Sequence, residues 1–259
     1  MPFVEAGDLR VHYALSGPAG APVVVFSNSL GTNFSMWDPQ LPVIEKNFRV
    51  LRYDTRGHGN SAVTPGPYTI EQLARDVLHL LDALRIDRVH FCGLSMGGMI
   101  GMWLGANAPR RIHRLALCST AAKIGSPETW NPRIEAIRKG GMKAVAGLVI
   151  ERWLTPAFRA RDPQAAAGAL HLVESASPEG YMACCAAVRD ADFRQSIHAI
   201  RAPTLIIMGA QDPATPPADG RFLAERIPGA QYAELDASHM ANLEAAGPFT
   251  AALNGFLSS

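Results

Sequence analysis

The sequence predicts an α/β fold in which helices flank a mostly parallel central sheet and a helical cap is inserted. Short apolar runs alternate with longer segments of helical period along most of the chain. Several of these runs are apolar on both faces, as buried parallel strands are. Residues 121–190 interrupt the alternation with an Ala- and Arg-rich stretch. With 259 residues, of which 48% are hydrophobic, the chain can bury a large core.

The predicted elements follow from residue type and period. Core strands are expected at residues 22–28, 49–54, 88–94, 113–119, 204–209 and 231–235. Two N-terminal runs, 3–5 and 9–14, are expected to form an antiparallel hairpin at the edge of the sheet. Apolar residues at three- and four-residue steps predict a helix over 70–84, and Thr69 with Gln72 gives it a capping-box pattern. Further helices are expected over 96–108, 218–227 and 240–257.

The interrupting stretch contains five prolines and no clear strand run. We therefore interpret residues 121–190 as a helical cap lying over the sheet. The α/β core then consists of two segments, residues 1–120 and 191–259.

Composition excludes several classes of function. The 24 basic and 23 acidic residues nearly balance, and no Lys/Arg block suited to a phosphate backbone is present, so we expect no nucleic-acid partner. The N-terminus lacks the parts of a signal peptide, and no apolar run approaches the ~18 residues of a membrane span, so we expect a cytoplasmic protein without a membrane partner. The four cysteines have neither disulfide nor metal-ligand spacing, and we expect no metal and no cofactor. Oligomeric state is left open.

A glycine-flanked serine follows the expected strand 88–94, in the segment Gly93-Leu94-Ser95-Met96-Gly97. The pattern Gly-x-Ser-x-Gly places a nucleophile in a strained strand-to-helix turn, where the glycines let the backbone fold back without a Cβ clash. The apolar strand before the motif and the helix-competent stretch after it provide the context that the motif requires. We predict Ser95 to be the nucleophile of a serine hydrolase.

A serine hydroxyl needs a base to take its proton and a carboxylate to orient that base. In hydrolases with this turn, the acid and then the histidine follow the serine along the chain. Asp212 lies just beyond the expected strand 204–209, and His239 lies in the turn after strand 231–235, so we predict them to be the acid and the base. Five other residues have the right type but lie in or near the insertion, or close before His239: His171, His198, Asp190, Asp192 and Asp236.

Hydrolysis also requires two donors directed at the developing oxyanion. We expect one from the backbone N–H of Met96, directly after the nucleophile. The second is expected from the loop after the first core strand, at the N–H of Leu30, with Gly31 permitting the close approach.

The segment of residues 54–61, Asp-Thr-Arg-Gly-His-Gly-Asn-Ser, follows another expected strand. It lacks both the spacing and the lysine of a phosphate-binding loop. We therefore interpret it as a rigid turn that supports the pocket, with His58 in a structural rather than a catalytic role.

The order of Ser95, Asp212 and His239, the turn at 54–61 and the inserted cap together resemble the α/β-hydrolase superfamily over the whole chain. A closer similarity lies in three segments: residues 27–32 (SNSLGT), residues 51–59 (LRYDTRGHG) and residues 184–192 (CCAAVRDAD). These segments resemble the bacterial 3-oxoadipate enol-lactonases. Most superfamily members have His-Gly where this chain has Asn28-Ser29.

The resemblance implies that the chain opens an enol-lactone bearing a carboxymethyl arm, in aromatic catabolism through the β-ketoadipate pathway. The substrate would be a small anionic lactone, and a cation of the cap would orient its free carboxylate. By position, Arg133 and Arg138 are candidates for that cation, Trp130 is a candidate hydrogen-bonding wall, and Ser29 is a candidate substrate contact. A solvated helix face remains open for each arginine.

Three alternatives keep the same scaffold. A carboxylesterase or a C–C bond hydrolase would have the same triad but a different substrate. A hydrolase-derived ligand sensor would have the triad and signal through its cap. A haloalkane dehalogenase is excluded, because it requires a carboxylate at position 95.

Overall fold

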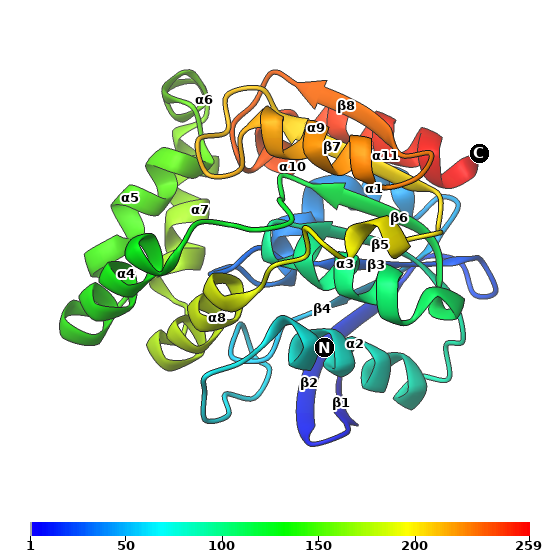
Figure 1. Ribbon diagram of the computed structural model, residues 1–259, viewed down its shortest axis with the longest axis horizontal. Coiled ribbons are helices and arrows are strands. Elements are labelled where there is room, and N and C mark those ends of the chain that lie inside the picture. The colour runs from blue at the N-terminus through cyan, green and yellow to red at the C-terminus, as the bar shows by residue number, and fades with distance from the viewer. Residues whose placement is uncertain (1) are drawn as a thin grey trace.

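The computed structural model describes residues 2–259, which form an eight-stranded sheet with helices on both faces (Figure 1). The strand order is β1-β2-β4-β3-β5-β6-β7-β8, and all neighbours from β4 to β8 are parallel. The mostly parallel sheet predicted from the sequence is therefore confirmed. Its strands are β1 Phe3–Ala6, β2 Leu9–Ser16, β3 Val23–Ser27, β4 Arg49–Tyr53, β5 Val89–Leu94, β6 Ile112–Cys118, β7 Thr204–Gly209 and β8 Gln231–Leu235.

The two N-terminal strands form the expected hairpin at one edge. Strand β1 pairs antiparallel with β2, and β2 pairs antiparallel with β4. The hairpin turns at Gly7, whose φ of 65° lies in the left-handed region that glycine adopts without a Cβ penalty. Strand β4 separates this hairpin from β3.

Helices of the core cover both faces of the sheet. Side chains alternate between faces along a strand, and Phe26 of β3 is paired with Cys92 of β5, so Phe26 and Phe91 face opposite ways. Gly101 of α3 packs on Phe91, whereas Trp37 stacks on Phe26 at a ring distance of 4.6 Å. The core helices are α1 Leu41–Ile44, α2 Ile70–Ala83, α3 Met96–Asn107, α9 Pro217–Arg226, α10 Ala241–Glu244 and α11 Ala246–Ser258, with short 3-10 helices at Phe34–Gln40, Pro109–Arg111 and Ile197–Ala199.

Helix α2 begins where the capping pattern predicts. The Gln72 N–H donates to Thr69 Oγ1 at 3.1 Å, which satisfies one of the free amides of the first turn. The apolar positions at helical spacing, among them Leu73, Val77 and Leu80, are buried. The helix therefore forms because one face of it covers the sheet.

The single helix expected over 240–257 is instead two helices, α10 and α11. Helical geometry is interrupted at Ala245, with φ −117° and ψ 46°. The interruption follows from Pro248, because in a continuous helix its ring would clash with the carbonyl of Glu244 and it has no N–H to donate there. Hydrophobic period alone did not reveal this break.

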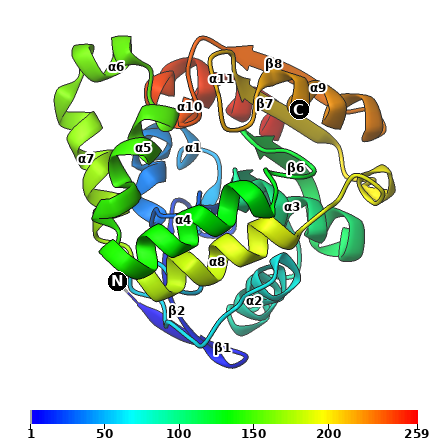
Figure 2. The ribbon, with the colours of Figure 1, turned by 60° about the vertical axis from the view of Figure 1, so that its left-hand side comes forward.

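Five helices form the segment predicted as a cap, and Figure 1 shows them together at one side of the sheet. Helices α4 and α8 lie side by side (Figure 2). Four of the five begin at a proline, which is suited to a first helical position because no N–H is needed there. They are α4 Pro127–Gly140, α5 Lys143–Trp153, α6 Pro156–Arg161, α7 Pro163–Glu174 and α8 Pro178–Asp190. The exact limits of core and cap stay a prediction.

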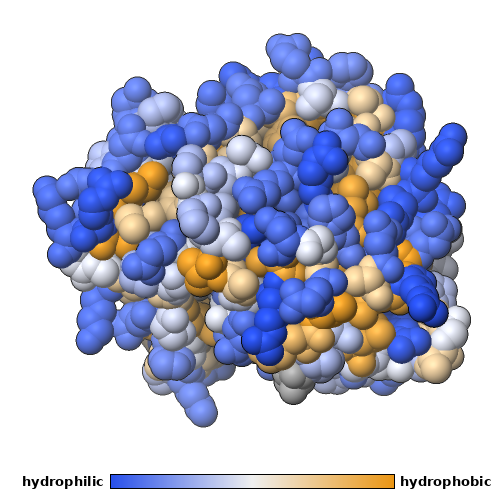
Figure 3. Space-filling view, turned by 90° about the horizontal axis from the view of Figure 1, so that it is seen from below, coloured by the Kyte–Doolittle hydropathy of each residue, from blue (hydrophilic) through white to orange (hydrophobic). Residues whose placement is uncertain are grey.

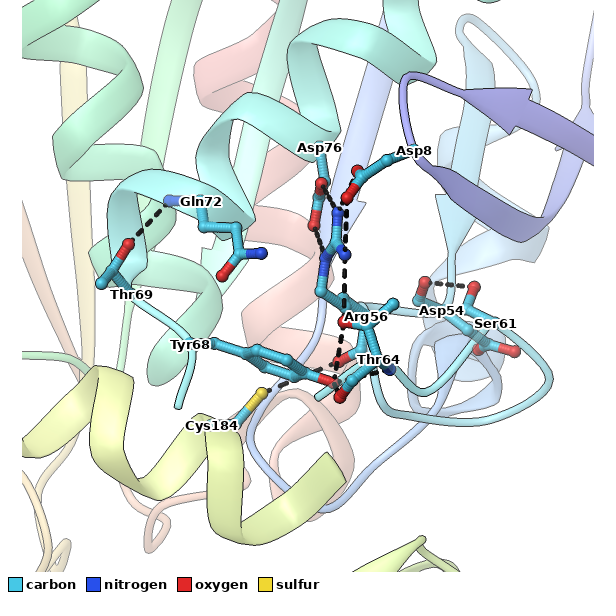
Figure 4. A network of polar contacts seen from close by, with 10 residues as sticks. All are labelled: Asp8, Asp54, Arg56, Ser61, Thr64, Tyr68, Thr69, Gln72, Asp76 and Cys184. Atoms are coloured by element: carbon cyan, nitrogen blue, oxygen red, sulfur yellow. Dashed lines mark hydrogen bonds and ion pairs between the residues drawn. The ribbon is translucent and has the colours of Figure 1, made fainter. Parts of the chain in front are cut away.

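Helix α8 contacts the turn at residues 54–61 very closely. A Cβ on Gly180 would lie 2.0 Å from the carbonyl oxygen of Gly57, so only glycine fits at this position. One helical turn further on, the Cys184 thiol lies 3.7 Å from the Arg56 carbonyl oxygen (Figure 4). The start of α8 therefore rests directly on the core.

Arg56, which belongs to the same turn, anchors it to neighbouring elements (Figure 4). Its guanidinium, 2% exposed, donates to both carboxylate oxygens of Asp76 at 2.8 and 2.6 Å. It also donates to Asp8 at 2.7 Å and to Thr64 Oγ1 at 3.1 Å. A bidentate pair of this kind fixes geometry as well as charge, so the turn is tied to α2 and to the N-terminal hairpin.

Large apolar side chains that stay exposed are scattered over separate segments: Phe3, Val43, Val63 and Leu148. Figure 3 shows one face of the molecule, on which apolar residues are interspersed with polar ones. Within residues 2–259, no helix combines the length and the apolar character needed to cross a membrane.

We predict that Gly180→Ala lowers the free energy of unfolding by about 1–3 kcal/mol, because the added methyl overlaps the Gly57 carbonyl. The matched control is Gly168→Ala in α7, where a Cβ meets nothing within 4 Å. There the change should raise stability by up to about 1 kcal/mol through helix propensity. Urea denaturation measures both, and equal shifts in the two variants would contradict the close contact.

Candidate active site

Ser95 lies between β5 and α3 in a strained conformation, with φ 57° and ψ −114°. The flanking glycines leave room for this turn. A Cβ on Gly93 would lie 2.1 Å from the Gly97 carbonyl oxygen, and one on Gly97 would lie 2.2 Å from the Ser27 carbonyl oxygen. A non-glycine residue at positive φ is uncommon and is kept only where the surrounding structure enforces it.

Two hydrogen bonds fix the strained turn. The Ser95 N–H donates to the Cys118 carbonyl at 2.9 Å, and the Thr120 hydroxyl donates to the Ser95 carbonyl at 2.8 Å. Both partners lie at or after the end of β6, so the neighbouring strand determines the position of the serine. The role of Thr120 in the site was not predicted from the sequence.

His239 and Asp212 come together as the sequence predicts. His239 Nδ1 lies 2.7 Å from Asp212 Oδ2, and both side chains are almost completely buried. Asp212 also accepts from the Thr215 hydroxyl at 2.7 Å and from the Ala214 N–H at 2.7 Å. With Nδ1 facing a carboxylate, the imidazole is oriented with its other nitrogen free to act as a base.

The environment keeps Asp212 ionised. Burial opposes ionisation of this carboxyl, but the facing His239 and the donated hydrogen bonds outweigh burial, and the net pKa is lowered from its ordinary value. An ionised carboxylate is what stabilises an imidazolium that forms beside it.

The His239 turn is joined to the cap on one side and to α10 on the other. The Ser238 hydroxyl donates to the Arg152 carbonyl at 2.8 Å, and the Met240 N–H donates to the Trp153 carbonyl at 3.0 Å. The Ser238 N–H donates to the Glu244 carboxylate at 3.0 Å. The end of helix α5 therefore helps to fix the candidate base.

The five other acidic and histidine residues considered as candidates lie elsewhere. Asp190 pairs with Arg189, and Asp192 pairs with Arg194. Asp236 accepts from the Gln211 amide, and His171 and His198 are exposed. None of these five side chains lines the cavity that contains Ser95.

The loop after β3 presents the backbone N–H of Leu30 between two amides that are already hydrogen-bonded. The Ser29 N–H contacts Met36 Sδ at 3.3 Å, and the Gly31 N–H donates to His58 Nε2 at 2.9 Å. Among residues 2–259, no acceptor is found for the N–H of Leu30 between them, nor for that of Met96 at the first position of α3. These are the two amides predicted for the oxyanion, and the N-terminal end of α3 also favours negative charge.

Asn28 explains part of the unusual segment before this loop. Its side chain donates to the Tyr53 carbonyl at 2.7 Å and accepts from the Trp37 indole N–H at 3.0 Å. Asn28 is completely buried, so it connects β3 to β4 and to the Phe34–Gln40 helix. Ser29, in contrast, lines the cavity.

One cavity of about 350 Å³ brings the candidate residues together. It contains Ser95 and His239 on the core side and side chains of α4, α5 and α8 on the cap side. Its lining residues are Ser29, Leu30, Ser95, Ile124, Gly125, Thr129, Trp130, Arg133, Val149, Arg152, Trp153, Tyr181, Pro213, Ala214 and His239.

The cavity contains two arginines, of which the sequence predicted one. Arg133 lies 4.9 Å from the Trp130 ring centre and lines the wall. Arg152, near the end of α5, was missed because no motif surrounds it. Arg138 does not reach the cavity; its side chain is 63% exposed and pairs with Glu135 at 2.5 Å, one turn away on the same helix.

Trp130 lines the cavity without a free donor. Its indole N–H donates to the Ile124 carbonyl at 2.7 Å. The hydrogen-bonding role expected for this residue therefore has to be corrected: the ring forms an aromatic wall beside Arg133, and its one polar hydrogen is already used.

No set of three or more His, Cys, Asp or Glu side chains within the described chain is grouped so that it could hold a metal ion.

A family model described as "alpha/beta hydrolase fold" matches residues 22–157 and 178–246. Because the match covers most of the chain, this protein belongs to the α/β-hydrolase fold family. Within that family it is similar to "3-oxoadipate enol-lactonase 2" of Acinetobacter baylyi, at 42% identity over 98% of this chain and 95% of that protein. "3-oxoadipate enol-lactonase 1" of the same organism is 39% identical, over 95% of this chain and 92% of that protein.

A solved structure gives the same result. The crystal structure of the enol-lactonase from Burkholderia xenovorans LB400 matches with a TM-score of 0.98 at 48% identity, covering 100% of both chains. The resemblance predicted from the three sequence segments is thus confirmed over the whole length.

We predict a pH dependence of stability from His58. Burial lowers its pKa from 6.5 to about 4, so the unfolded chain takes up a proton at higher pH than the native protein. The free energy of unfolding should therefore fall as pH decreases from 6.5 to about 4. Between pH ~7 and pH ~4.5, the free energy of unfolding should therefore fall by roughly 2–3 kcal/mol less in His58→Gln than in the wild type. Denaturation of both proteins at the two pH values measures this difference.

His90 is present in the wild type and in the His58→Gln variant, and burial also lowers its pKa to about 4. The stability of the variant therefore still depends on pH to some extent. Only the difference between the two curves reports on His58. Parallel curves would show that this imidazole does not titrate as the structure implies.

Proposed function

We propose that this chain is a serine hydrolase that opens 3-oxoadipate enol-lactone to 3-oxoadipate in the β-ketoadipate route of aromatic degradation. One observation supports this proposal most strongly: the cavity that contains Ser95 and His239 also contains two arginines suited to a carboxylate. Relatives at 42% and 48% identity are named for this lactone or as an enol-lactonase.

In the first half of the proposed reaction, Ser95 Oγ attacks the lactone carbonyl while His239 takes the serine proton. The carbonyl oxygen becomes an oxyanion, which accepts from the N–H groups of Leu30 and Met96. Each such donor contributes on the order of 10² to 10³ in rate. Asp212 orients His239 and stabilises its protonated form.

Collapse of the tetrahedral intermediate breaks the bond between the acyl carbon and the ring oxygen. His239 returns its proton, and the ring oxygen leaves as an enol that tautomerises to the ketone. The enol and its carboxymethyl arm stay joined to the acyl group on Ser95, because opening a lactone ring releases no separate leaving group. Water, deprotonated by His239, then attacks the acyl-enzyme and frees 3-oxoadipate from Ser95.

The free carboxylate of the lactone would bind at the cap side of the cavity. Arg133 is the stronger candidate, because its side chain is partly buried and lies beside the Trp130 ring. Arg152 is exposed, so solvent screens its charge and we assign it a smaller share. Ser29 lines the same cavity as a polar contact. The cytoplasmic location and the lack of nucleic-acid or membrane partners stay predictions from the sequence.

Ser95→Ala should lower enol-lactone hydrolysis by several orders of magnitude without loss of the fold, because no other nucleophile is placed at the turn. The ultraviolet absorbance of the enol-lactone gives the rate, and p-nitrophenyl acetate is assayed beside it. Undiminished turnover in the variant would overturn the assignment of Ser95. Wild-type protein that hydrolyses the acetate but not the lactone would indicate another esterase, and a slow single turnover with a large ligand-induced rise in Tm would indicate a sensor.

Arg133→Met should lower kcat/KM for the lactone by roughly 10- to 100-fold, mainly through KM, because a charge-assisted hydrogen bond is lost. For Arg152→Met we expect kcat/KM for the lactone to fall only roughly 2- to 5-fold, since this side chain is exposed. The matched control is Arg138→Met, on the same helix as Arg133 but outside the cavity, which should leave KM unchanged. Equal effects of Arg133→Met on the lactone and on neutral p-nitrophenyl acetate would exclude Arg133 as a carboxylate anchor.

A further inference from the structure

His58 is buried directly beside the loop that offers the Leu30 amide. The residue is 1% exposed, and its Nε2 accepts the Gly31 N–H at 2.9 Å. The other nitrogen, Nδ1, lies 3.4 Å from the Arg56 carbonyl and 3.9 Å from Cys184 Sγ. His58 does not line the substrate cavity, so it cannot act on the substrate itself.

The hydrogen bond defines the tautomer of this histidine. An imidazole nitrogen that accepts an N–H must be unprotonated, so the single ring proton lies on Nδ1. Nδ1 then faces the Arg56 carbonyl as a donor. Burial lowers the pKa of His58 to about 4, so the ring is neutral and can accept over the whole neutral range.

The hydrogen bond from Gly31 to His58 helps to determine the direction of the neighbouring Leu30 N–H. Two amides on either side of Leu30 are engaged, Ser29 with Met36 Sδ and Gly31 with His58 Nε2. Fixing both flanking peptide groups leaves the peptide between them little freedom to rotate, and this peptide provides the Leu30 N–H. Gly31 has φ 82°, where its Cβ would lie 2.7 Å from the Tyr181 ring, so the loop is also confined from the cap side.

His58 is itself rigidly placed. The Gly57 N–H donates to the Ala62 carbonyl at 3.0 Å, and the His58 N–H donates to the Thr55 carbonyl at 2.8 Å. The adjacent Arg56 is held by the bidentate contact with Asp76. A continuous set of contacts thus runs from that buried ion pair to the loop beside Ser95.

We propose that His58 is a positioning residue, whose neutral Nε2 holds the Gly31 amide so that the Leu30 N–H is directed at the oxyanion formed on Ser95. The inference rests on the proposed function for the roles of Ser95 and Leu30. It does not depend on which ester or lactone is the substrate.

The test compares variants that differ in the acceptor. His58→Gln places an amide oxygen near the position of Nε2, whereas His58→Leu has no acceptor, and His58→Asn places its amide near Nδ1 and cannot reach Gly31. We expect kcat to fall roughly 10- to 100-fold in the Leu and Asn variants with KM nearly unchanged, because a misdirected donor loses part of its 10² to 10³ contribution. The Gln variant should stay within about fivefold of wild type.

A second readout separates positioning from a general loss of structure. Phenylboronic acid forms a tetrahedral adduct with the serine, and one oxygen of that adduct occupies the oxyanion position. Its Ki should rise tenfold or more in the Leu and Asn variants and should recover in the Gln variant, while Tm is monitored for all three. Should the Leu variant not fold, the Asn and Gln pair decides the question.

Both readouts are run with p-nitrophenyl acetate as well as with the enol-lactone. If wild type hydrolyses only the acetate, the proposed substrate is wrong, and the His58 comparison still stands on the acetate and on boronate affinity. The inference is overturned if the Asn and Leu variants keep wild-type kcat and boronate affinity. It is also overturned if the His58→Gln variant folds but loses as much activity as the His58→Asn variant.

Discussion

The tight turn at Ser95 is the constraint on which the rest of the structure depends. Strand β5 must reverse into α3 in a space where the Gly97 carbonyl would lie 2.1 Å from a Cβ at Gly93. The strained φ of 57° is maintained by the end of β6, through hydrogen bonds to Cys118 and from Thr120. Parallel strands that end at one edge place the loops bearing Leu30, Asp212 and His239 around that serine.

The cap contacts this edge at two separate places. Helix α8 touches the turn at 54–61 through Gly180, and its Tyr181 confines Gly31 in the oxyanion loop. The end of α5 accepts from Ser238 and Met240, on either side of His239. The cap therefore bounds the substrate cavity and also supports the candidate oxyanion loop and the candidate base, so a change in the cap is expected to affect rate as well as binding.

The strands, the nucleophile turn and the order of the candidate triad followed from the sequence, because apolar runs, glycine spacing and chain order are local or directional signals. Asp236 pairs with Gln211 through a tertiary contact, whereas Asp190 and Asp192 pair with the nearby Arg189 and Arg194. The break before Pro248 follows from a single backbone clash, which hydrophobic period does not reveal. Arg152 faces the cavity only because α5 ends beside the His239 turn. The opposite placements of Arg133 and Arg138 reflect helical phase relative to a partner helix, which period alone does not give.

The central claim is that Ser95 attacks the lactone, and labelling with a fluorophosphonate tests it most directly. The serine oxygen forms a bond to phosphorus while the P–F bond breaks, and the adduct is located by peptide mass spectrometry. The account predicts one phosphonyl group per chain, on Ser95, with lactone hydrolysis lost in proportion to labelling and with the lactone slowing the reaction. Full labelling of Ser95 with lactone hydrolysis intact, or stoichiometric labelling of another residue, would contradict it.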